Sequence, residues 1–171
     1  MAASKRKASI ICQALKGAGI NFGVYLPETW LKEVNALLTK DPQIKYVGVT
    51  REEEGVGVAA GASLGGKRAA LIVDVTGLGN SITALLGIHR AQRIPLLILA
   101  SHRGSIGERE AFLPESWAWA GALLQDLRIP YSVLTDVQEA TRVIRDSQKT
   151  AEAQRAPVAV LLAASALLEE E

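Results

Sequence analysis

Three consecutive glutamates, Glu52, Glu53 and Glu54, stand directly before a run of small and aliphatic residues in the stretch TREEEGVGVAAG. A carboxylate in such a place can complement the positive end of a helix, or it can hold a proton for a reaction beside that helix. Thr50 and Glu53 have the spacing of a capping box, in which a glutamate three residues after the cap bonds back to it. Glu52 is the acid that this box leaves least explained.

Three further segments carry residues that could bind a ligand, and each directly follows an apolar run. The first holds the acid Glu28, and the second is the glycine-containing stretch TGLGN at 76–80. Glycines let a ligand approach the backbone, although a single Gly-x-Gly lacks the third glycine of the dinucleotide fingerprint. The third is SHRG at 101–104, where Arg103 suits an anion and His102 can donate hydrogen bonds or carry a proton. A tight turn and a surface ion pair would explain the glycines and the arginine equally well.

The apolar periodicity predicts the elements that carry these segments. Strands are expected at 22–26, 44–49, 69–75, 94–100, 131–134 and 157–163. Helices are expected at 5–16, 30–38, 51–64, 80–92, 116–127 and 137–154, with a long polar loop at 101–114. Alternating strands and helices predict an α/β fold, and continuous apolar strands predict a parallel sheet buried on both faces.

The expected architecture is therefore a single three-layer domain over residues 1–171, with a parallel sheet of six strands and helices on both faces. In open sheets of this kind, ligands bind beyond the carboxyl ends of the strands. The acids, the glycines and SHRG all follow predicted strands. We therefore expect them to meet at one edge.

Composition narrows the choice of partners. The 171 residues include 19 basic and 18 acidic ones, for a net charge of +1, which gives no support for a nucleic acid or an anionic membrane as a partner. The single cysteine, Cys12, cannot form a disulfide or a multi-cysteine metal site within the chain. No apolar run has the length of a membrane span or the form of a signal peptide, so we expect a cytoplasmic protein.

The stretches REEEGVGVAAG, GLGNS and IPLLILASHRG together resemble the pyrimidine-binding domain of thiamine-diphosphate enzymes. With GVYLPETWLKEV at 23–34, they are most similar to the alpha subunits of sulfopyruvate decarboxylases and to the N-terminal half of phosphonopyruvate decarboxylases. That family carries a glutamate nine residues before a glycine, and Glu52 stands nine residues before Gly61. The resemblance implies that Glu52 is catalytic and hydrogen-bonds the aminopyrimidine ring of thiamine diphosphate. It also implies cofactor contacts at Gly77, Leu78, Gly79 and Asn80, and substrate contacts at Pro27, Glu28, Thr29, His102 and Arg103.

The family holds its diphosphate through a divalent cation on a Gly-Asp-Gly motif, and this sequence has no Gly-Asp-Gly. The resemblance therefore implies no metal ligands in this chain and a separate beta subunit that carries the motif and Mg²⁺. The expected enzyme is a carbon–carbon lyase, active only in a hetero-oligomer, that converts 3-sulfopyruvate to sulfoacetaldehyde and CO₂.

Two other functions remain open from the sequence. Glu28 and Thr29 stand where relatives commonly have Asp-Ser, so the substrate could be phosphonopyruvate or another anionic 2-oxoacid. From a different class, the chain could be a non-catalytic, flavodoxin-like binding module whose glutamates only start a helix.

Two tryptophans, Trp117 and Trp119, lie two residues apart in a predicted helix and should point to nearly opposite sides. One can join the core, and the other is a candidate for an interface with a partner. A partly exposed tryptophan that rests on the long loop is an equally good explanation.

Overall fold

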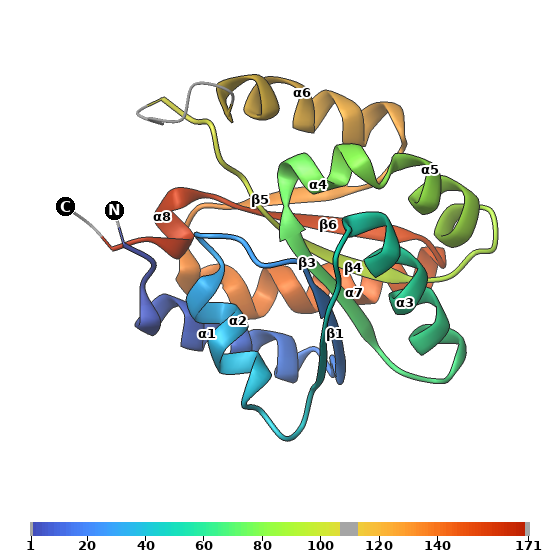
Figure 1. The fold of residues 1–171 in the computed structure, drawn as a ribbon, viewed down its shortest axis with the longest axis horizontal. Helices are drawn as coiled ribbons and strands as arrows, with labels where there is room; N and C mark the ends of the chain where they lie inside the picture. The colour runs from blue at the N-terminus through green and yellow to red at the C-terminus, as the bar shows by residue number, and fades with distance from the viewer. Residues whose placement is uncertain (1, 107–112, 170–171) are drawn as a thin grey trace.

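A six-stranded parallel sheet forms the centre of the computed structural model, which describes residues 2–106 and 113–169 (Figure 1). Its strands are β1 (Phe22–Tyr25), β2 (Lys45–Gly48), β3 (Ala69–Asp74), β4 (Leu96–Ser101), β5 (Tyr131–Leu134) and β6 (Pro157–Leu162). They lie in the order β2-β1-β3-β4-β6-β5, and all neighbours pair in parallel. The predicted α/β class and parallel sheet are confirmed.

Helices cover both faces of this sheet (Figure 1). The helices α1 (Lys5–Gly17), α2 (Lys32–Thr39) and α7 (Ala140–Gln154) pack on one face. The other face carries α3 (Glu52–Leu64), α4 (Val75–Asn80), α5 (Ile82–Ala84), the π-helical segment η1 (Leu85–Arg90) and α6 (Leu113–Asp126). A 3₁₀ turn, η2 (Val137–Glu139), precedes α7, and α8 (Ala164–Leu167) follows β6. Within the described residues, no helix is long and apolar enough to cross a membrane.

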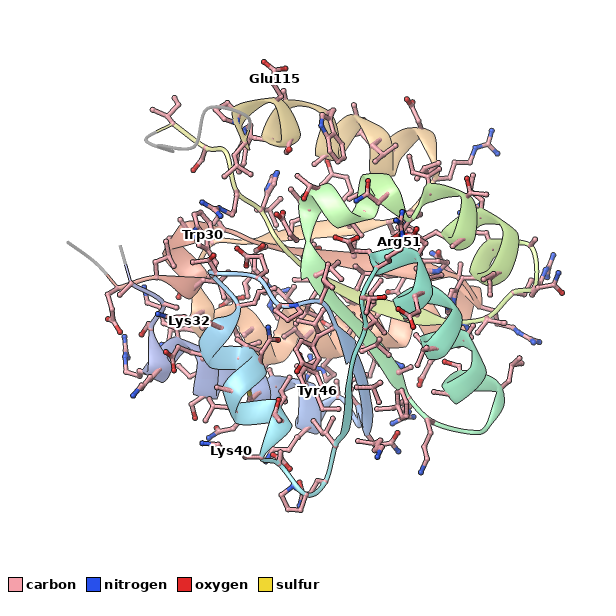
Figure 2. The ribbon with its side chains drawn as sticks, in the orientation of Figure 1. Trp30, Lys32, Lys40, Tyr46, Arg51 and Glu115 are labelled. Carbon is pink, nitrogen blue, oxygen red and sulfur yellow. The ribbon has the colours of Figure 1, made fainter. Side chains whose placement is uncertain are left out.

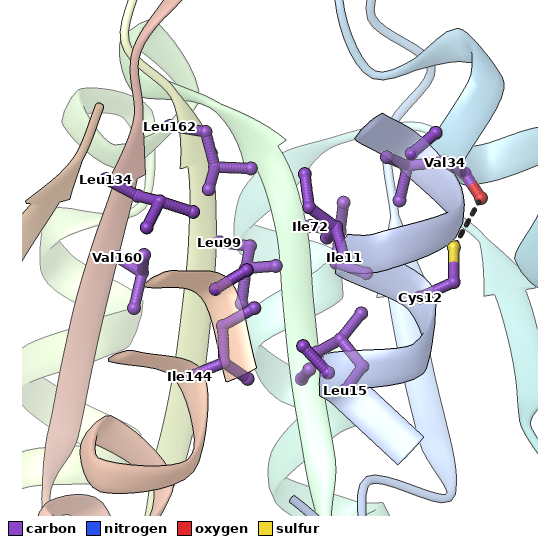
Figure 3. Packing of buried hydrophobic residues seen from close by; sticks show 14 of the residues in the cluster. Ile11, Cys12, Leu15, Val34, Ile72, Leu99, Leu134, Ile144, Val160 and Leu162 are labelled. Carbon is purple, nitrogen blue, oxygen red and sulfur yellow. Dashed lines mark hydrogen bonds between the residues drawn. The ribbon is translucent and has the colours of Figure 1, made fainter. Parts of the chain in front are cut away.

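The central strands supply both apolar layers because successive side chains of a strand point to opposite faces. Ile72 and Leu99 belong to the cluster beneath α1 and α7, whereas Val73 and Ile98 belong to the cluster on the other face. Figure 3 shows the first cluster, with Ile11 of α1 beside Ile72. This two-sided burial explains why β3 and β4 read as continuous apolar runs rather than alternating patterns.

The segment after β3 differs from the prediction. A turn at 76–80 and one helix at 80–92 were expected, but α4 already begins at Val75, and α5 and η1 divide the rest of the segment. Asp74 is the physical reason, because its Oδ1 accepts a hydrogen bond from the backbone N–H of Thr76 at 3.1 Å and caps the helix at the strand end. Gly77 and Gly79 therefore lie inside a helix and not in a turn.

The strand order places a topological switch point at β1, which has β2 on one side and β3 on the other. The connections that leave β1 and β3 at their carboxyl ends therefore diverge, and a crevice between such connections is where open α/β sheets bind ligands. The connection after β1 carries Glu28, and the one after β3 follows directly on Asp74, the last residue of that strand.

Cys12 is the single cysteine of the chain, so its reactivity reports on the core. It is 6% exposed and its Sγ lies 3.8 Å from the carbonyl oxygen of Val34 (Figure 3). Burial raises the pKa of this thiol to about 12, and the charge of Asp41 adds to the rise. Because the thiolate is the reactive form and its share at pH 8 falls about 1,000-fold, the folded chain should react with iodoacetamide more than about 100-fold more slowly than the urea-unfolded chain. Equal rates in the two states would contradict this placement of Cys12.

Candidate active site

Glu52 is the first residue of α3 and its side chain lies against α4. A Cβ atom on Gly77 would come within 2.5 Å of Glu52 Cγ and 2.8 Å of Oε1, so the side chain occupies the space that a larger residue would fill. Asn80 lies about one helical turn after Gly77 in α4. Its Nδ2 is 3.5 Å from Glu52 Oε2, which is a long hydrogen bond. Two of the four residues predicted to bind the cofactor therefore touch the predicted catalytic acid.

The predicted capping box of Thr50 and Glu53 is wrong. Arg51 is the N-cap of α3 and has an extended backbone conformation, and its side chain pairs with Glu53. Figure 2 labels Arg51 at the start of this helix. Glu54 reaches back instead, where its Oε2 accepts hydrogen bonds from the N–H of Thr50 at 3.0 Å and from its hydroxyl at 2.9 Å. These bonds lower the pKa of Glu54. Glu53 and Glu54 thus have local partners at the helix start, while the carboxylate of Glu52 lies against α4.

The other two predicted cofactor residues make different contacts. Leu78 is 1% exposed and packs in the apolar core, so its side chain holds α4 on the sheet. A Cβ on Gly79 would lie 3.1 Å from the ring of Trp119, so this glycine faces α6 and not Glu52. Trp119 also lines an open, largely apolar depression of about 400 Å³ between α4, α5 and α6, together with Ile82, Ala122, Leu123 and Asp126.

Glu28 follows β1 and is held from two sides. Its carboxylate accepts the backbone N–H groups of Trp30 at 2.9 Å and Leu31 at 3.0 Å, and its Oε1 lies 3.7 Å from Nη1 of Arg103. The guanidinium of Arg103 also lies 5.1 Å from the centre of the Trp30 ring, within cation–π range. Figure 2 shows Trp30 just before α2. Burial raises the pKa of Glu28, the N–H of Trp30 opposes this effect, and the nearby charge of Asp74 reinforces it.

His102 directly follows β4 and is 6% exposed. Its ring stacks on the indole of Trp117, with centroids 3.9 Å apart and planes inclined by 15°. Among the described residues, neither ring nitrogen has a hydrogen-bond partner of ordinary geometry, and the same holds for the buried hydroxyl of Ser101, which lies near the carboxylate of Glu28. Burial lowers the pKa of His102, and a backbone contact with Trp117 opposes the shift in part.

The structure brings the predicted residues to one sheet edge in two groups. The first group is Glu52 with Gly77 and Asn80 at the contact of α3 with α4. The second group joins residues at or after the ends of β1 and β4 with one residue of α6. Its members are Glu28, Trp30, Ser101, His102, Arg103 and Trp117. Of the predicted substrate residues, Pro27 and Thr29 flank Glu28 on the segment between β1 and α2.

Sequence patterns assigned no substrate or cofactor contact to Trp30, Asp74 or Trp117, and singled out Ser101 only as part of SHRG. The structure places all four in or beside these groups. Asp74 and Ser101 carried a usable signal, because each is the first polar residue after a buried apolar run. Trp30 and Trp117 carried no such sequence signal, since their contacts depend on how the helices pack. The loop expected at 101–114 begins one residue later, because Ser101 ends β4, and α6 already begins at Leu113; the part of the loop at 107–112 lies outside the described residues.

Comparison with known proteins identifies the family. Residues 5–120 match the model of the N-terminal TPP (thiamine pyrophosphate, or thiamine diphosphate) binding domain of thiamine pyrophosphate enzymes. The chain therefore belongs to the thiamine-diphosphate enzymes that share this N-terminal domain. The alpha subunit of sulfopyruvate decarboxylase from Methanococcus maripaludis is 38% identical over 152 residues, which are 89% of this chain and 91% of that protein. The chain belongs to the family of these alpha subunits.

Longer proteins contain a similar segment. Sulfopyruvate decarboxylase from Methanosarcina acetivorans is 34% identical over 131 residues, which are 75% of this chain and 33% of that protein. Phosphonopyruvate decarboxylase from Streptomyces viridochromogenes is 33% identical over 103 residues, 60% of this chain and 26% of that protein. A structure of 2-oxoglutarate:ferredoxin oxidoreductase from Magnetococcus marinus, with 2-oxoglutarate, coenzyme A and succinyl-CoA bound, has a TM-score of 0.74 over 94% of this chain and 29% of its own. At 22% identity, this last likeness shows the fold alone.

The contact of Glu52 with Gly77 predicts the effect of a Gly77→Ala substitution. The new methyl group should drive Glu52 into another rotamer and break its contact with Asn80. The urea midpoint should change little, because a rotamer cost of about 0.5–1.5 kcal/mol offsets a helix-propensity gain of about 1 kcal/mol. A crystal structure and urea unfolding measure the two effects.

The matched control is Gly57→Ala in α3, where an added Cβ would have nothing within 4 Å. It should leave Glu52 in place and stabilise the chain by about 0.5–1 kcal/mol. An unchanged Glu52 rotamer in Gly77→Ala would contradict the close contact between these two residues.

Proposed function

We propose that this chain is the pyrimidine-binding subunit of a thiamine-diphosphate-dependent 2-oxoacid decarboxylase, a carbon–carbon lyase, that converts 3-sulfopyruvate to sulfoacetaldehyde and CO₂. The observation that carries the proposal is the carboxylate of Glu52 lying on the bare backbone of Gly77 at the carboxyl edge of the sheet. Residues 1–171 would act as one pyrimidine-binding domain. The Methanococcus relative, named for sulfopyruvate, supports the substrate.

The residues around Glu52 suit an aminopyrimidine ring. A flat ring needs an edge without side chains, and Gly77 and Gly79 offer bare backbone on α4. Asn80 orients the carboxylate of Glu52, and Leu78 anchors α4 in the core. In this arrangement Glu52 holds a proton at a ring nitrogen of the pyrimidine. Thiamine diphosphate, when bound, supplies the electron sink that decarboxylation of a 2-oxoacid requires.

The group around Arg103 suits the anionic tail of the substrate. Its guanidinium is fixed by the Trp30 ring and by Glu28, and it presents forked donors for an oxyanion. His102 would donate a hydrogen bond to the 2-oxoacid. Pro27 and Thr29, on either side of Glu28, would line the entrance to this substrate-binding group.

Charge favours a sulfonate over a phosphonate at this place. The positive charge of Arg103 is already shared with Glu28 at 3.7 Å, and Asp74 lies close enough to raise the pKa of Glu28. A sulfonate brings one negative charge, whereas a phosphate-type group brings about 1.5 to 2 near pH 7. Glu28 and Asp74 would repel the second negative charge of a phosphonate, which disfavours phosphonopyruvate. It remains the alternative substrate because the Streptomyces relative is named for it.

A second subunit would complete the enzyme. The sequence has no Gly-Asp-Gly motif, so we assign the diphosphate and its Mg²⁺ to a beta subunit that carries one. The relatives support this division, because the Methanococcus protein is named subunit alpha, whereas the single Methanosarcina chain is matched over only 33% of its length. The assembly would be a hetero-oligomer. A non-catalytic binding module is less well supported, because Arg51, Glu53 and Glu54 serve the helix start without Glu52.

Replacement of Glu52 by Gln tests the catalytic assignment. An amide cannot hold the proton, so kcat of the complex with the beta subunit should fall by about 100- to 10,000-fold while the melting temperature stays within a few degrees. Carbon dioxide release from 3-sulfopyruvate measures the rate. Glu54→Gln is the matched control, since it alters the bonds to Thr50 but should keep the rate. Equal rates for Glu52→Gln and the unmodified complex would refute the assignment.

Replacement of Arg103 by Met tests the tail-binding assignment. The loss of a charge-assisted bond, about 1.5–3 kcal/mol, should raise KM for 3-sulfopyruvate by about 10- to 150-fold. Pyruvate has no anionic tail, so its own slow turnover should be much less affected. Arg142→Met, at an exposed pair with Glu139, controls for lost charge. A similar loss with both substrates would place Arg103 elsewhere in the mechanism.

A further inference from the structure

Trp117 contacts the site through the face of its indole, although it lies on a helix that the sequence did not connect with the chemistry. The ring is stacked on His102 at 3.9 Å, and Trp117 itself is 38% exposed. An aromatic side chain that only filled the core would be buried far more completely. Its large contact with one polar ring therefore calls for an explanation other than core packing.

The second histidine of the chain shows how this fold treats a buried imidazole with a structural role. His89 of η1 is fully buried, and its two ring nitrogens each lie 3.1 Å from a carbonyl oxygen, those of Ile94 and Val56. His102 is almost as buried, yet neither of its nitrogens has a partner among the described residues. Buried polar atoms are normally satisfied, and exceptions call for a functional reason.

A stack on one face restricts how a ligand can bond to His102. The donor and acceptor directions of an imidazole lie in the ring plane, so fixing that plane fixes the directions from which a ligand can bond to the two nitrogens. The backbone N–H of His102 donates to the carbonyl oxygen of Leu162 at 2.8 Å and fixes the other end of the residue. Backbone and indole together determine the plane in which the two nitrogens lie.

We propose that Trp117 is a positioning residue whose indole sets the plane of the His102 imidazole, so that its two ring nitrogens are oriented to bond a 2-oxoacid substrate. The identity of that ligand rests on the function proposed above, but the positioning itself does not. Because the nitrogens are buried in the free chain, a bound substrate has to displace the atoms that cover them.

The position of Trp117 on α6 extends this role. Two residues further on, Trp119 packs against Gly79 of α4. The same helix therefore contacts the histidine of the substrate group through one tryptophan and the helix that carries the cofactor group through the other. A shift of α6 would therefore change the contact with His102 and the contact with Gly79 together.

The charges near His102 determine the expected pH behaviour. Among the described residues, they are Arg103 on the same segment, Glu28 after β1, Asp74 at the end of β3 and Glu115 on α6, which Figure 2 shows on the outer side of that helix. The neighbouring β6 and α8 contain no ionisable side chains. Burial is the leading cause of the lowered pKa of His102, so access of water to the ring should raise this pKa towards its ordinary value.

Nuclear magnetic resonance of the full chain tests the positioning directly, because only two histidines contribute signals. In Trp117→Leu, the ring C–H signals of His102 should lose the upfield shift caused by the indole, and the pKa of His102 should rise. His89 should not change in either respect. Trp117→Phe keeps an aromatic face and should restore most of both values.

Trp119→Leu is the matched control on the same helix, since Trp119 contacts Gly79 and not His102. It should leave the His102 signals and pKa unchanged. Unchanged His102 values in folded Trp117→Leu would overturn the proposal, and so would equal changes in both leucine variants. If Trp117→Leu does not fold, a Trp117→Phe variant whose His102 signals have lost the upfield shift of the native chain overturns it as well.

Kinetics of the reconstituted complex separate this proposal from the proposed function. Trp117→Leu should lower kcat/KM for 3-sulfopyruvate by about 2- to 10-fold, mostly through KM, and move the acid limb of its pH profile to higher pH. Trp117→Phe should recover the loss. An unmodified complex that does not decarboxylate 3-sulfopyruvate would refute the function and leave the resonance result standing. An active complex whose pH profile is identical in Trp117→Leu would refute the positioning role.

Discussion

The parallel pairing of β3 with β4 is the constraint on which the site depends. Both strands are buried along their length on both faces, so neither face of the sheet offers a polar side chain of theirs to a ligand. The register pairs Asp74 with Ser101, and the first polar residues of the two strands therefore emerge side by side at the carboxyl edge. The residues that follow Asp74 and Ser101 therefore also lie at the carboxyl edge. The polar side chains that could bind a ligand lie at this edge because the interior of the sheet is packed with apolar side chains.

Acids at this edge differ in what holds them, and that difference supports different roles. Glu28 is bound by backbone N–H groups and paired with Arg103, so its charge is largely committed. Asp74 caps α4. Glu52 has one long bond, from Asn80, and otherwise rests on a glycine, which leaves its carboxylate the most available of the three. Catalytic groups are typically those whose bonding capacity the fold has not used.

Much of this arrangement was predictable from the sequence, because it depends on local patterns. Continuous apolar runs located β3, β4 and β6 to within two residues, and their order implied which segments share the edge. Two errors came from bonds between near neighbours: Asp74 started α4 early, and Glu54 rather than Glu53 bonded to Thr50. Spacing rules describe which bonds a helix start can make, whereas the choice between adjacent acids depends on backbone angles that no spacing encodes. The stack of Trp117 on His102 could not be predicted from the sequence, since it joins two elements whose relative packing only the fold determines.

The distribution of unsatisfied polar atoms shows how incomplete this site is in the chain alone. Five buried side-chain atoms among the described residues have no hydrogen-bond partner, and three of them belong to the consecutive residues Ser101 and His102. Each such atom carries a desolvation cost of about 1–3 kcal/mol, which the core of β3 and β4 has to offset. Random packing defects would be scattered, but these three atoms are adjacent and lie at the carboxyl edge, where Ser101 pairs with Asp74. A ligand that supplies their partners would recover this cost on binding, so the same atoms that weaken the isolated chain would strengthen its hold on that ligand.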